Sequence, residues 1–293
     1  MSVLFCDSDC ELWYEDIERL GIEYIKMPYT LDEVETFYDM GKTTDFKHFY
    51  DRVRAGAMPI TSAINPDVYE EIIEPYFKKG EDIFYIAFGR EFSGTFEHLD
   101  TALKNLKVKY PQRKMTIFDT KAISVPTGVQ VKYAAELWKK GATDEELLDF
   151  LNEFTHHVNC YFVVDSLKHL YRGGRLSKAG MIAGSILGIK PILTFNEKGG
   201  LSVAKKIKGR KAAARFLAQE VIDNVRKLDE YEIYVLDADD EENGNRIRDM
   251  IKEALPNANI VRQPVGPVIG THCGPGTVAT VYYGDKRIIP LAK

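Results

Sequence analysis

The sequence has little cysteine and no regular spacing of metal ligands. Only four of its 293 residues are cysteines, and of these only Cys6 and Cys10 stand close together, in the run C-D-S-D-C. That spacing fits neither a zinc ribbon nor a C-x-x-C redox pair, so we expect reduced cysteines that serve mainly in packing. No pair of histidines has the spacing of metal ligands either, and we expect no metal site.

The sequence also lacks a long apolar run and a strong excess of charge. No run approaches the length that crosses a membrane, and Asp7 follows the start too closely for a signal peptide. The net charge is -5, which argues against a protein that mainly grips nucleic acid phosphates. We therefore expect a cytoplasmic protein without a nucleic acid partner, for which a transient contact with a membrane surface is left open.

What the sequence does contain is a succession of strand and helix patterns that predicts an α/β fold of two domains. Residues 1–158 should hold a Rossmann-like parallel sheet, because apolar runs of strand length are followed by helical patterns. Residues 159–293 combine such patterns with a hairpin signal at Glu197–Gly200, which is typical of an α+β sandwich with a mixed sheet. The predicted strands of the first domain are 2–5, 22–27, 83–87 and 115–118, and its predicted helices include 11–20, 66–79, 127–140 and 143–157. For residues 28–58 we expect only an edge hairpin at the aromatic run E-T-F-Y-D-M-G (35–41) and a helix over 45–55, without a fixed arrangement.

The stretch Asp82–Leu103 is the most informative part of the chain. It reads D-I-F-Y-I-A-F-G-R-E-F-S-G-T-F-E-H-L-D-T-A-L, an unbroken apolar strand, a polar turn and a helix that begins near Thr95. In a parallel sheet such a turn lies at the carboxyl end of a strand, where the free amides of the next helix favour an anion. Turns with similar hydroxyls follow other strands, so Thr61, Ser62, Ser93, Asp119 and Ser124 are expected to line one crevice.

Two enzymatic interpretations compete with an anion-binding site. Ser93 in a strand-to-helix turn is similar to a hydrolase nucleophile, but the G-x-S-x-G pattern is missing because Glu91 and Thr95 stand at the glycine positions. Asp7 and Asp119, each at a strand end, would suit a phosphatase, although such acids often only cap turns. A purely structural helix cap at Ser93 is a third interpretation.

Several motifs, taken in order, resemble those of the DegV family over nearly the whole chain. These are T-S at 61–62, F-S-G-T at 92–95, F-D-T-K-A-I-S at 118–124, L-Y-R-G-G-R-L-S at 170–177, I-K-P-I-L at 189–193, K-G-R-K-A-A at 208–213 and T-H-C-G-P-G-T at 271–277. Each motif is weak by itself, whereas their common order is specific. The resemblance implies a non-catalytic protein that holds one long-chain fatty acid between two domains and needs no metal or nucleotide cofactor.

The resemblance also implies roles for particular residues. The hydroxyls of Ser93 and of Thr61 or Ser62, together with the amides of Gly94 and Thr95, would bind the carboxylate of the fatty acid. His272, in the predicted glycine-rich loop before the last strand, would close over that carboxylate from the second domain. An ordinary loop histidine is the alternative at this position.

A kinase partner is the second implication of the resemblance. In many bacteria such proteins are the binding subunit of a fatty acid kinase, whose separate catalytic subunit phosphorylates the carboxylate. Arg172 and Arg210 lie in basic motifs of the second domain, and they would dock the kinase or face the phosphate. A solvated basic surface is the alternative for both motifs.

The chain departs from the family pattern at its first motif. Many members read T-S-x-P-S, whereas this sequence has Thr61 and Ser62 followed by Ala63, Ile64 and Asn65 before the proline. The displaced proline leaves open which of the two hydroxyls faces the ligand.

Overall fold

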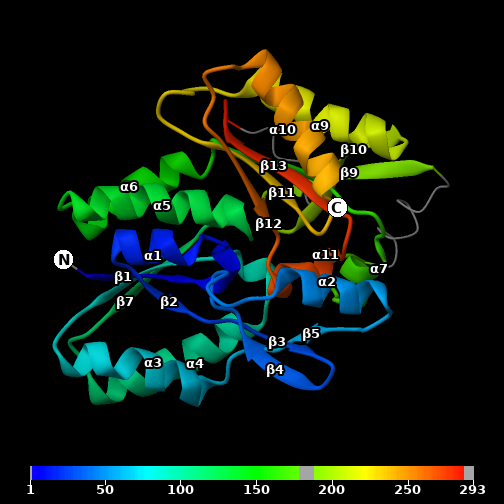
Figure 1. Cartoon of the computed structure of the whole chain (residues 1–293). Coiled ribbons are helices and arrows are strands. Elements are labelled where there is room, and N and C mark those ends of the chain that lie inside the picture. Colours follow the sequence, from blue (N-terminus) through cyan, green and yellow to red (C-terminus); the bar gives the residue numbers. More distant parts are fainter. Residues whose placement is uncertain (1, 178–187, 287–293) are drawn as a thin grey trace. The chain divides into compact units, whose positions relative to one another are not determined.

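The computed structural model describes residues 2–177 and 188–286 and divides into two compact units (Figure 1). The first unit comprises Met1–Thr44 and Thr61–Thr155, and the second comprises Asp45–Ile60 and His156–Lys293. Segment 45–60 therefore packs with the second unit, although the sequence gave no sign that a segment from the N-terminal part of the chain would do so. The domain ranges 1–158 and 159–293 stay a prediction.

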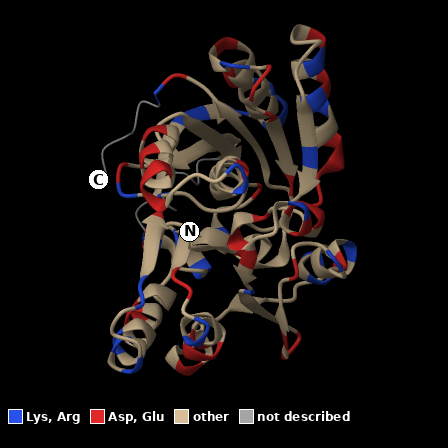
Figure 2. Cartoon of the chain, turned by 90° about the vertical axis from the view of Figure 1, so that its left-hand side faces the viewer, with Lys and Arg blue, Asp and Glu red and all other residues tan. Residues whose placement is uncertain are grey.

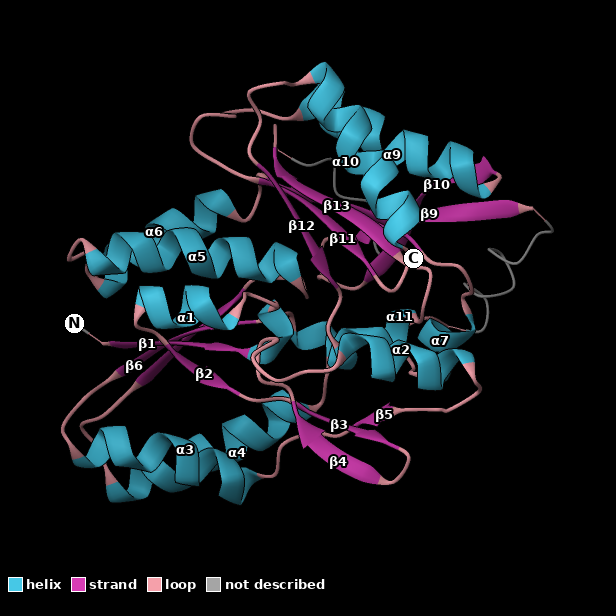
Figure 3. Cartoon of the chain, viewed as in Figure 1, coloured by secondary structure: helices cyan, strands magenta, loops and turns pink. Residues whose placement is uncertain are grey.

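A parallel sheet of four strands forms the centre of the first unit, in the order β2-β1-β6-β7. Helices α1, α5 and α6 cover one face of this sheet, and α3 and α4 cover the other (Figure 3). Helices on both faces explain why the apolar run of β6 is buried at all five positions. The elements are β1 (Val3–Asp7), α1 (Tyr14–Leu20), β2 (Glu23–Ile25), α3 (Pro66–Lys78), β6 (Ile83–Ala87), α4 (Thr95–Lys109), β7 (Met115–Asp119), α5 (Val125–Lys139) and α6 (Asp144–Phe154). The predicted parallel α/β sheet is confirmed.

Local sequence signals account for several ends of these helices. Gly21 ends α1 in the left-handed region, with φ of 69°, where a residue without Cβ is favoured. Thr143 and Glu146 form a reciprocal capping box at the start of α6. Asn65 precedes Pro66 at the start of α3, as expected, but its side chain makes no capping hydrogen bond.

The region 28–58 contains both a hairpin and a helix. Strands β3 (Pro28–Leu31) and β4 (Val34–Phe37) pair antiparallel, and the sheet order β4-β3-β5 adds the short β5 (Ile60–Thr61). Helix α2 (Phe46–Arg54) follows the hairpin, and the Asp45 side chain caps it by accepting from the His48 amide. The expected helix is thus present, whereas the hairpin spans 28–37 and begins before the run 35–41 where it was expected.

The second unit contains a mixed sheet of six strands in the order β10-β9-β8-β13-β11-β12. Its hairpin β9/β10 is antiparallel around the predicted turn, whereas β11 and β12 run parallel. Helices α9 and α10 cover one face of the sheet, and their apolar side chains share a buried cluster with the strands (Figure 1). The elements are β8 (Val158–Val163), α7 (Lys168–Arg172), β9 (Ile189–Phe195), β10 (Leu201–Lys208), α9 (Arg210–Asn224), β11 (Ile233–Asp237), α10 (Glu241–Ala254), β12 (Ile260–Pro264), α11 (Pro267–Cys273) and β13 (Val278–Tyr283).

The segment before the last strand differs from the expected glycine-rich loop. Pro267 opens the short helix α11, and His272 lies in its last turn. Gly270 in this helix fits closely against α2, where an added Cβ would lie 2.6 Å from the Tyr50 hydroxyl oxygen. Tertiary packing therefore overrides the loop signal of the glycines.

Basic and acidic residues are interspersed along the helices. Basic and acidic segments both occur along the helices of the face drawn in Figure 2, in keeping with the net charge of -5. Among the helices of the two described ranges, none is both long and apolar enough to cross a bilayer.

Candidate functional site

Asp7, the last residue of β1, connects neighbouring strands at the carboxyl edge of the parallel sheet. Its buried carboxylate accepts hydrogen bonds from the Tyr85 hydroxyl at 2.8 Å and from the Phe88 amide at 3.1 Å. It also accepts from the Asp9 amide at 3.0 Å. Burial raises the pKa of Asp7 to about 7, against the lowering effect of these donors. The carboxylate thereby fixes where the chain leaves β6.

The loops after β6 and β7 are also joined to each other. The Gly89 amide donates to the Ala122 carbonyl at 2.6 Å, and the Thr120 amide donates to the Ala87 carbonyl at 3.1 Å. A Cβ at Gly89 would lie 3.1 Å from the Ala122 backbone nitrogen, so the close approach requires a small residue. These bonds hold the loop that leads to Ser93 against its neighbour.

Ser93 lies between this loop and α4, with a half-buried side chain. Its hydroxyl oxygen accepts from the Thr95 amide, the first of α4, at 3.2 Å, although the N-cap residue of this helix is Gly94 and not Ser93. A hydroxyl that accepts through a lone pair still has its own proton to donate. No acceptor for that proton is found among residues 2–177 and 188–286, and the adjacent Gly94 is exposed.

The Thr95 side chain has a role that the sequence did not reveal. Its hydroxyl is buried and shares a hydrogen bond with the Tyr69 hydroxyl at 2.8 Å, while it accepts from the Ile64 amide at 3.1 Å. His98 Nδ1 pairs with the Ile64 carbonyl at 2.8 Å. Thr95 and His98 thus anchor the segment that follows Thr61 and Ser62 to the start of α4. Tyr69 was recognisable only as one apolar-face position of α3.

Thr61 and Ser62 stand at the start of that anchored segment. Thr61 ends β5 and is half-buried, whereas Ser62 is exposed. Within the described ranges the Ser62 hydroxyl has no hydrogen-bond partner. The first unit therefore brings together the two polar segments of which Ser62 and Ser93 are part, through the contact of Ile64 with Thr95.

His272 belongs to the second unit, where α11 packs against α7. Burial, together with the nearby charges of Arg175 and Arg172, lowers the pKa of His272 to about 3. The imidazole of His272 lies directly against Gly173, so a side chain at Gly173 would collide with it. His272 is consequently neutral at pH 7, and it can donate a hydrogen bond but carries no charge.

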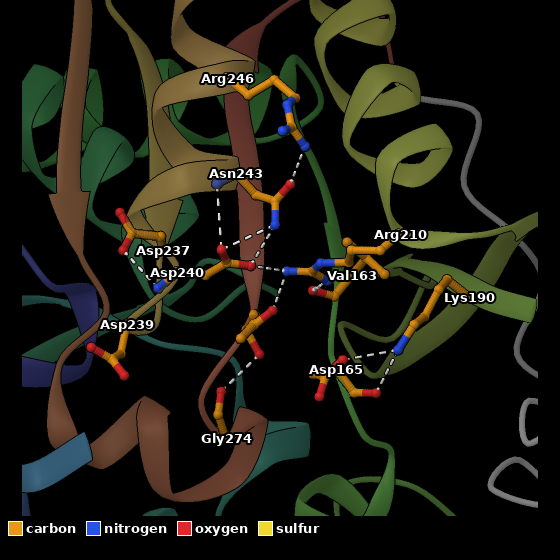
Figure 4. A network of polar contacts seen from close by, with 12 residues as sticks. Val163, Asp165, Lys190, Arg210, Asp237, Asp239, Asp240, Asn243, Arg246 and Gly274 are labelled. Carbon is orange, nitrogen blue, oxygen red and sulfur yellow. Dashed lines mark hydrogen bonds and ion pairs between the residues drawn. The ribbon is translucent and has the colours of Figure 1, made fainter. Parts of the chain in front are cut away.

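The two arginines of the basic motifs differ in their surroundings. The guanidinium of Arg210 donates to Asp240 at 2.6 Å, to the Val163 carbonyl at 3.4 Å and to the Gly276 carbonyl (Figure 4). It thereby connects β8, the start of α10 and the chain before β13. Arg172 is exposed and has no hydrogen bond or ion pair within the described part of the chain.

The strand-end acids of the phosphatase interpretation have structural contacts. Asp7 is enclosed by its donors, and Asp119 accepts from the Lys121 amide at 2.8 Å, as a turn cap does. Over residues 2–177 and 188–286 no group of three or more His, Cys, Asp or Glu side chains is placed to hold a metal ion. All four cysteines are free and buried.

Comparison with known proteins places this architecture in a family. The family model described as "Uncharacterised protein, DegV family" matches residues 2–285. The chain belongs to the DegV family. A DegV domain-containing protein of Clostridium perfringens is 35% identical over 285 residues, which cover 97% of this chain and 98% of that protein. Another, from Caldanaerobacter subterraneus, is 31% identical over 96% of this chain and 97% of its own length.

Solved structures of DegV proteins share the fold. The Bacillus subtilis protein, described as a fatty acid binding protein, is 28% identical with a TM-score of 0.80 and covers 97% of this chain and 99% of its own. A Thermus thermophilus member, described by its fatty acid binding, is 24% identical with a TM-score of 0.82, over 96% and 99% of the two chains. The two-domain α/β fold of the family is therefore shared by this chain.

The raised pKa of Asp7 predicts a distinctive pH dependence. Because the folded state retains the Asp7 proton up to about pH 7 and the unfolded chain loses it near the ordinary pKa of 3.8, this carboxyl lowers the free energy of unfolding as pH rises through that window. Asp7→Asn cannot ionise, so its penalty relative to the wild type should be larger at about pH 5 than at about pH 8. Urea unfolding of both proteins at each pH measures this difference. A penalty that is constant or grows with pH contradicts the assignment.

Proposed function

We propose that this DegV protein binds one long-chain fatty acid and presents its carboxylate to a separate kinase subunit. The observation that carries the proposal is the Ser93 hydroxyl, which accepts from the Thr95 amide and keeps its own proton for an anionic acceptor. Fatty acid binding by the Bacillus subtilis relative, with 28% identity over 97% of this chain, supports the same ligand class. Under this proposal the protein acts in the cytoplasm as a non-catalytic subunit.

The proposed carboxylate site uses neutral donors. A buried carboxylate is strongly disfavoured unless several donors satisfy it, and Ser93, Gly94 and Ser62 or Thr61 offer hydroxyls and an amide. The direct contact of Thr95 stays a prediction of the family resemblance, since its amide and hydroxyl orient Ser93 and the 61–64 segment.

His272 enters the proposal through its protonation state. A histidine whose pKa is about 3 would donate to the carboxylate as a neutral group, and ordinary changes near pH 7 would not alter that contact. Its assignment to the same ligand rests on the family resemblance.

Arginines of the second unit are the proposed contacts of the kinase. Arg172 is exposed and without a partner among the described residues, so its guanidinium can reach a phosphate or an acidic surface. Arg210 already has three acceptors, and a change there would disturb the fold as well. Arg172 is therefore the better residue for a test.

Ser93→Ala should weaken fatty acid binding by about 1 to 3 kcal/mol, or roughly 5-fold to 150-fold in Kd, because a hydrogen bond to a charged group is lost. Isothermal titration of delipidated protein with oleate measures the effect. Ser202→Ala on β10, far along the chain from the site, is the matched control and should leave Kd unchanged. If oleate and shorter and longer acids all fail to bind the wild type, the proposal is wrong. If Ser93→Ala binds normally, Ser93 is only a helix cap.

Arg172→Ala should leave the oleate Kd unchanged but slow acyl phosphate formation by about tenfold in a reconstituted kinase assay, since arginine is frequent among interface hot spots. Arg215→Ala removes an equally exposed arginine of the same unit and serves as the control. Equal rates for the wild type and both variants would show that Arg172 is only part of a solvated basic surface.

A further inference from the structure

A cavity of about 460 Å³ opens on the first unit beside α4 and the start of β7. This volume is within the range of small-molecule sites. Met115, the first residue of β7, lines the cavity and pairs with Ile83, the first residue of β6. The loop that carries Ser93 follows the carboxyl end of β6 at Ala87. The cavity therefore lies at the opposite edge of the parallel sheet, where the strands begin. It is separate from the proposed carboxylate site.

One face of α4 supplies half of the lining. Asp100 stands three and four residues before Leu103 and Lys104, and Lys107 stands four and three residues after them, which places all four along one stripe of the helix. The neighbouring stripe of α4 faces the core, where Leu99, Ala102 and Leu106 are fully buried. The stripe along the cavity is therefore fixed in place by the packing of the same helix.

The charge of the lining is strongly positive. Lys104 and Lys107 from α4 join Arg113 and Lys114 from the chain that enters β7. The single carboxylate in the lining, Asp100, is already paired with Arg90 at 3.1 Å. The lining therefore holds four cations and one carboxylate that is neutralised from outside, although Arg113 is itself paired with Asp82 at 3.7 Å. Lys104, Lys107 and Lys114 are the remaining cations, on a chain whose net charge is -5.

The cations differ in how far they are occupied. Lys107 donates to the Arg113 carbonyl at 3.2 Å, and the Arg113 guanidinium donates to the Gly80 carbonyl. The amines of Lys104 and Lys114 have no hydrogen bond or ion pair within residues 2–177 and 188–286. Lys107 and Arg113 are thus held by hydrogen bonds, whereas the amines of Lys104 and Lys114 have no partner among the described residues and line the same cavity.

Part of the lining is apolar. Phe77 from α3, which is only 4% exposed, lines the cavity together with the half-buried Leu103 and Met115. A solvated lysine face needs no such apolar lining. Apolar side chains and several cations in one cavity suit a ligand that has an apolar body and a compact group of high negative charge.

We propose that this cavity binds a phosphate monoester carried on a compact apolar group. A phosphate dianion can accept from several ammonium groups at once, and lysine binds phosphate as a point charge. The phosphate can belong to a soluble metabolite or to the headgroup of a lipid. This inference does not depend on fatty acid binding, because it concerns the other edge of the sheet.

The test uses the full chain and two phosphate probes, phenyl phosphate and inorganic phosphate. In NMR titrations, phenyl phosphate should give saturable chemical-shift changes at the amides of Leu103, Lys104, Lys107 and Met115. Inorganic phosphate should bind at least about tenfold more weakly, because it does not cover the apolar part of the lining. Lys104→Gln with Lys107→Gln should raise the Kd of phenyl phosphate by about tenfold or more. Lys140→Gln with Lys198→Gln removes two exposed charges elsewhere and should change nothing.

A vesicle arm distinguishes the two sources of phosphate. If the protein sediments with phosphatidic acid vesicles but not with phosphatidylcholine vesicles, and if this sedimentation requires Lys104 and Lys107, the phosphate belongs to a lipid headgroup. If phenyl phosphate binds saturably but the protein does not sediment with either vesicle, the ligand is soluble. The proposal is overturned if phenyl phosphate gives no saturable shifts, if inorganic phosphate binds equally well, or if only a hexaglutamate peptide binds. The last result would assign the cavity to an acidic protein partner.

Discussion

The buried carboxylate of Asp7 is the contact on which the carboxyl edge of the first unit depends. It accepts from Tyr85, Phe88 and Asp9, so the first strand of the chain determines where β6 ends and the Ser93 loop begins. Burying a carboxylate without hydrogen-bond donors would cost much free energy. The fold supplies three donors to Asp7, and burial raises the pKa of Asp7, which favours its neutral form. A residue that sequence patterns offered as a phosphatase acid is thus part of the scaffold.

A second layer of hydrogen bonds builds the candidate site on that scaffold. Thr95 connects Ser93 to the segment after Ser62 through its amide and its hydroxyl. Under the proposed function, the hydroxyls of Ser93 and of the T-S motif would bind the ligand, and the buried hydroxyl of Thr95 keeps the two segments in position. Donors at a helix start suit an anionic group such as a carboxylate.

Local patterns in the sequence predicted most of this fold, and non-local packing explains what they missed. The β6 run, the α6 capping box and the β9/β10 hairpin each depend on neighbouring residues, and each is present as expected. Helix α11 was missed because Gly270 is set by its contact with Tyr50, which is distant in sequence. The network around Arg210 was missed for the same reason, since its acceptors come from three separate segments.

The central claim, that this chain carries one long-chain fatty acid, has a direct chemical test. The purified protein is denatured and extracted with organic solvent, and the extract is quantified by mass spectrometry. Because burying an acyl chain is favourable by about 0.8 kcal/mol per CH₂, the account predicts co-purified fatty acid in near-equimolar amount. Protein that is repeatedly free of fatty acid after native purification, and that takes up none when fatty acids are added, would contradict it.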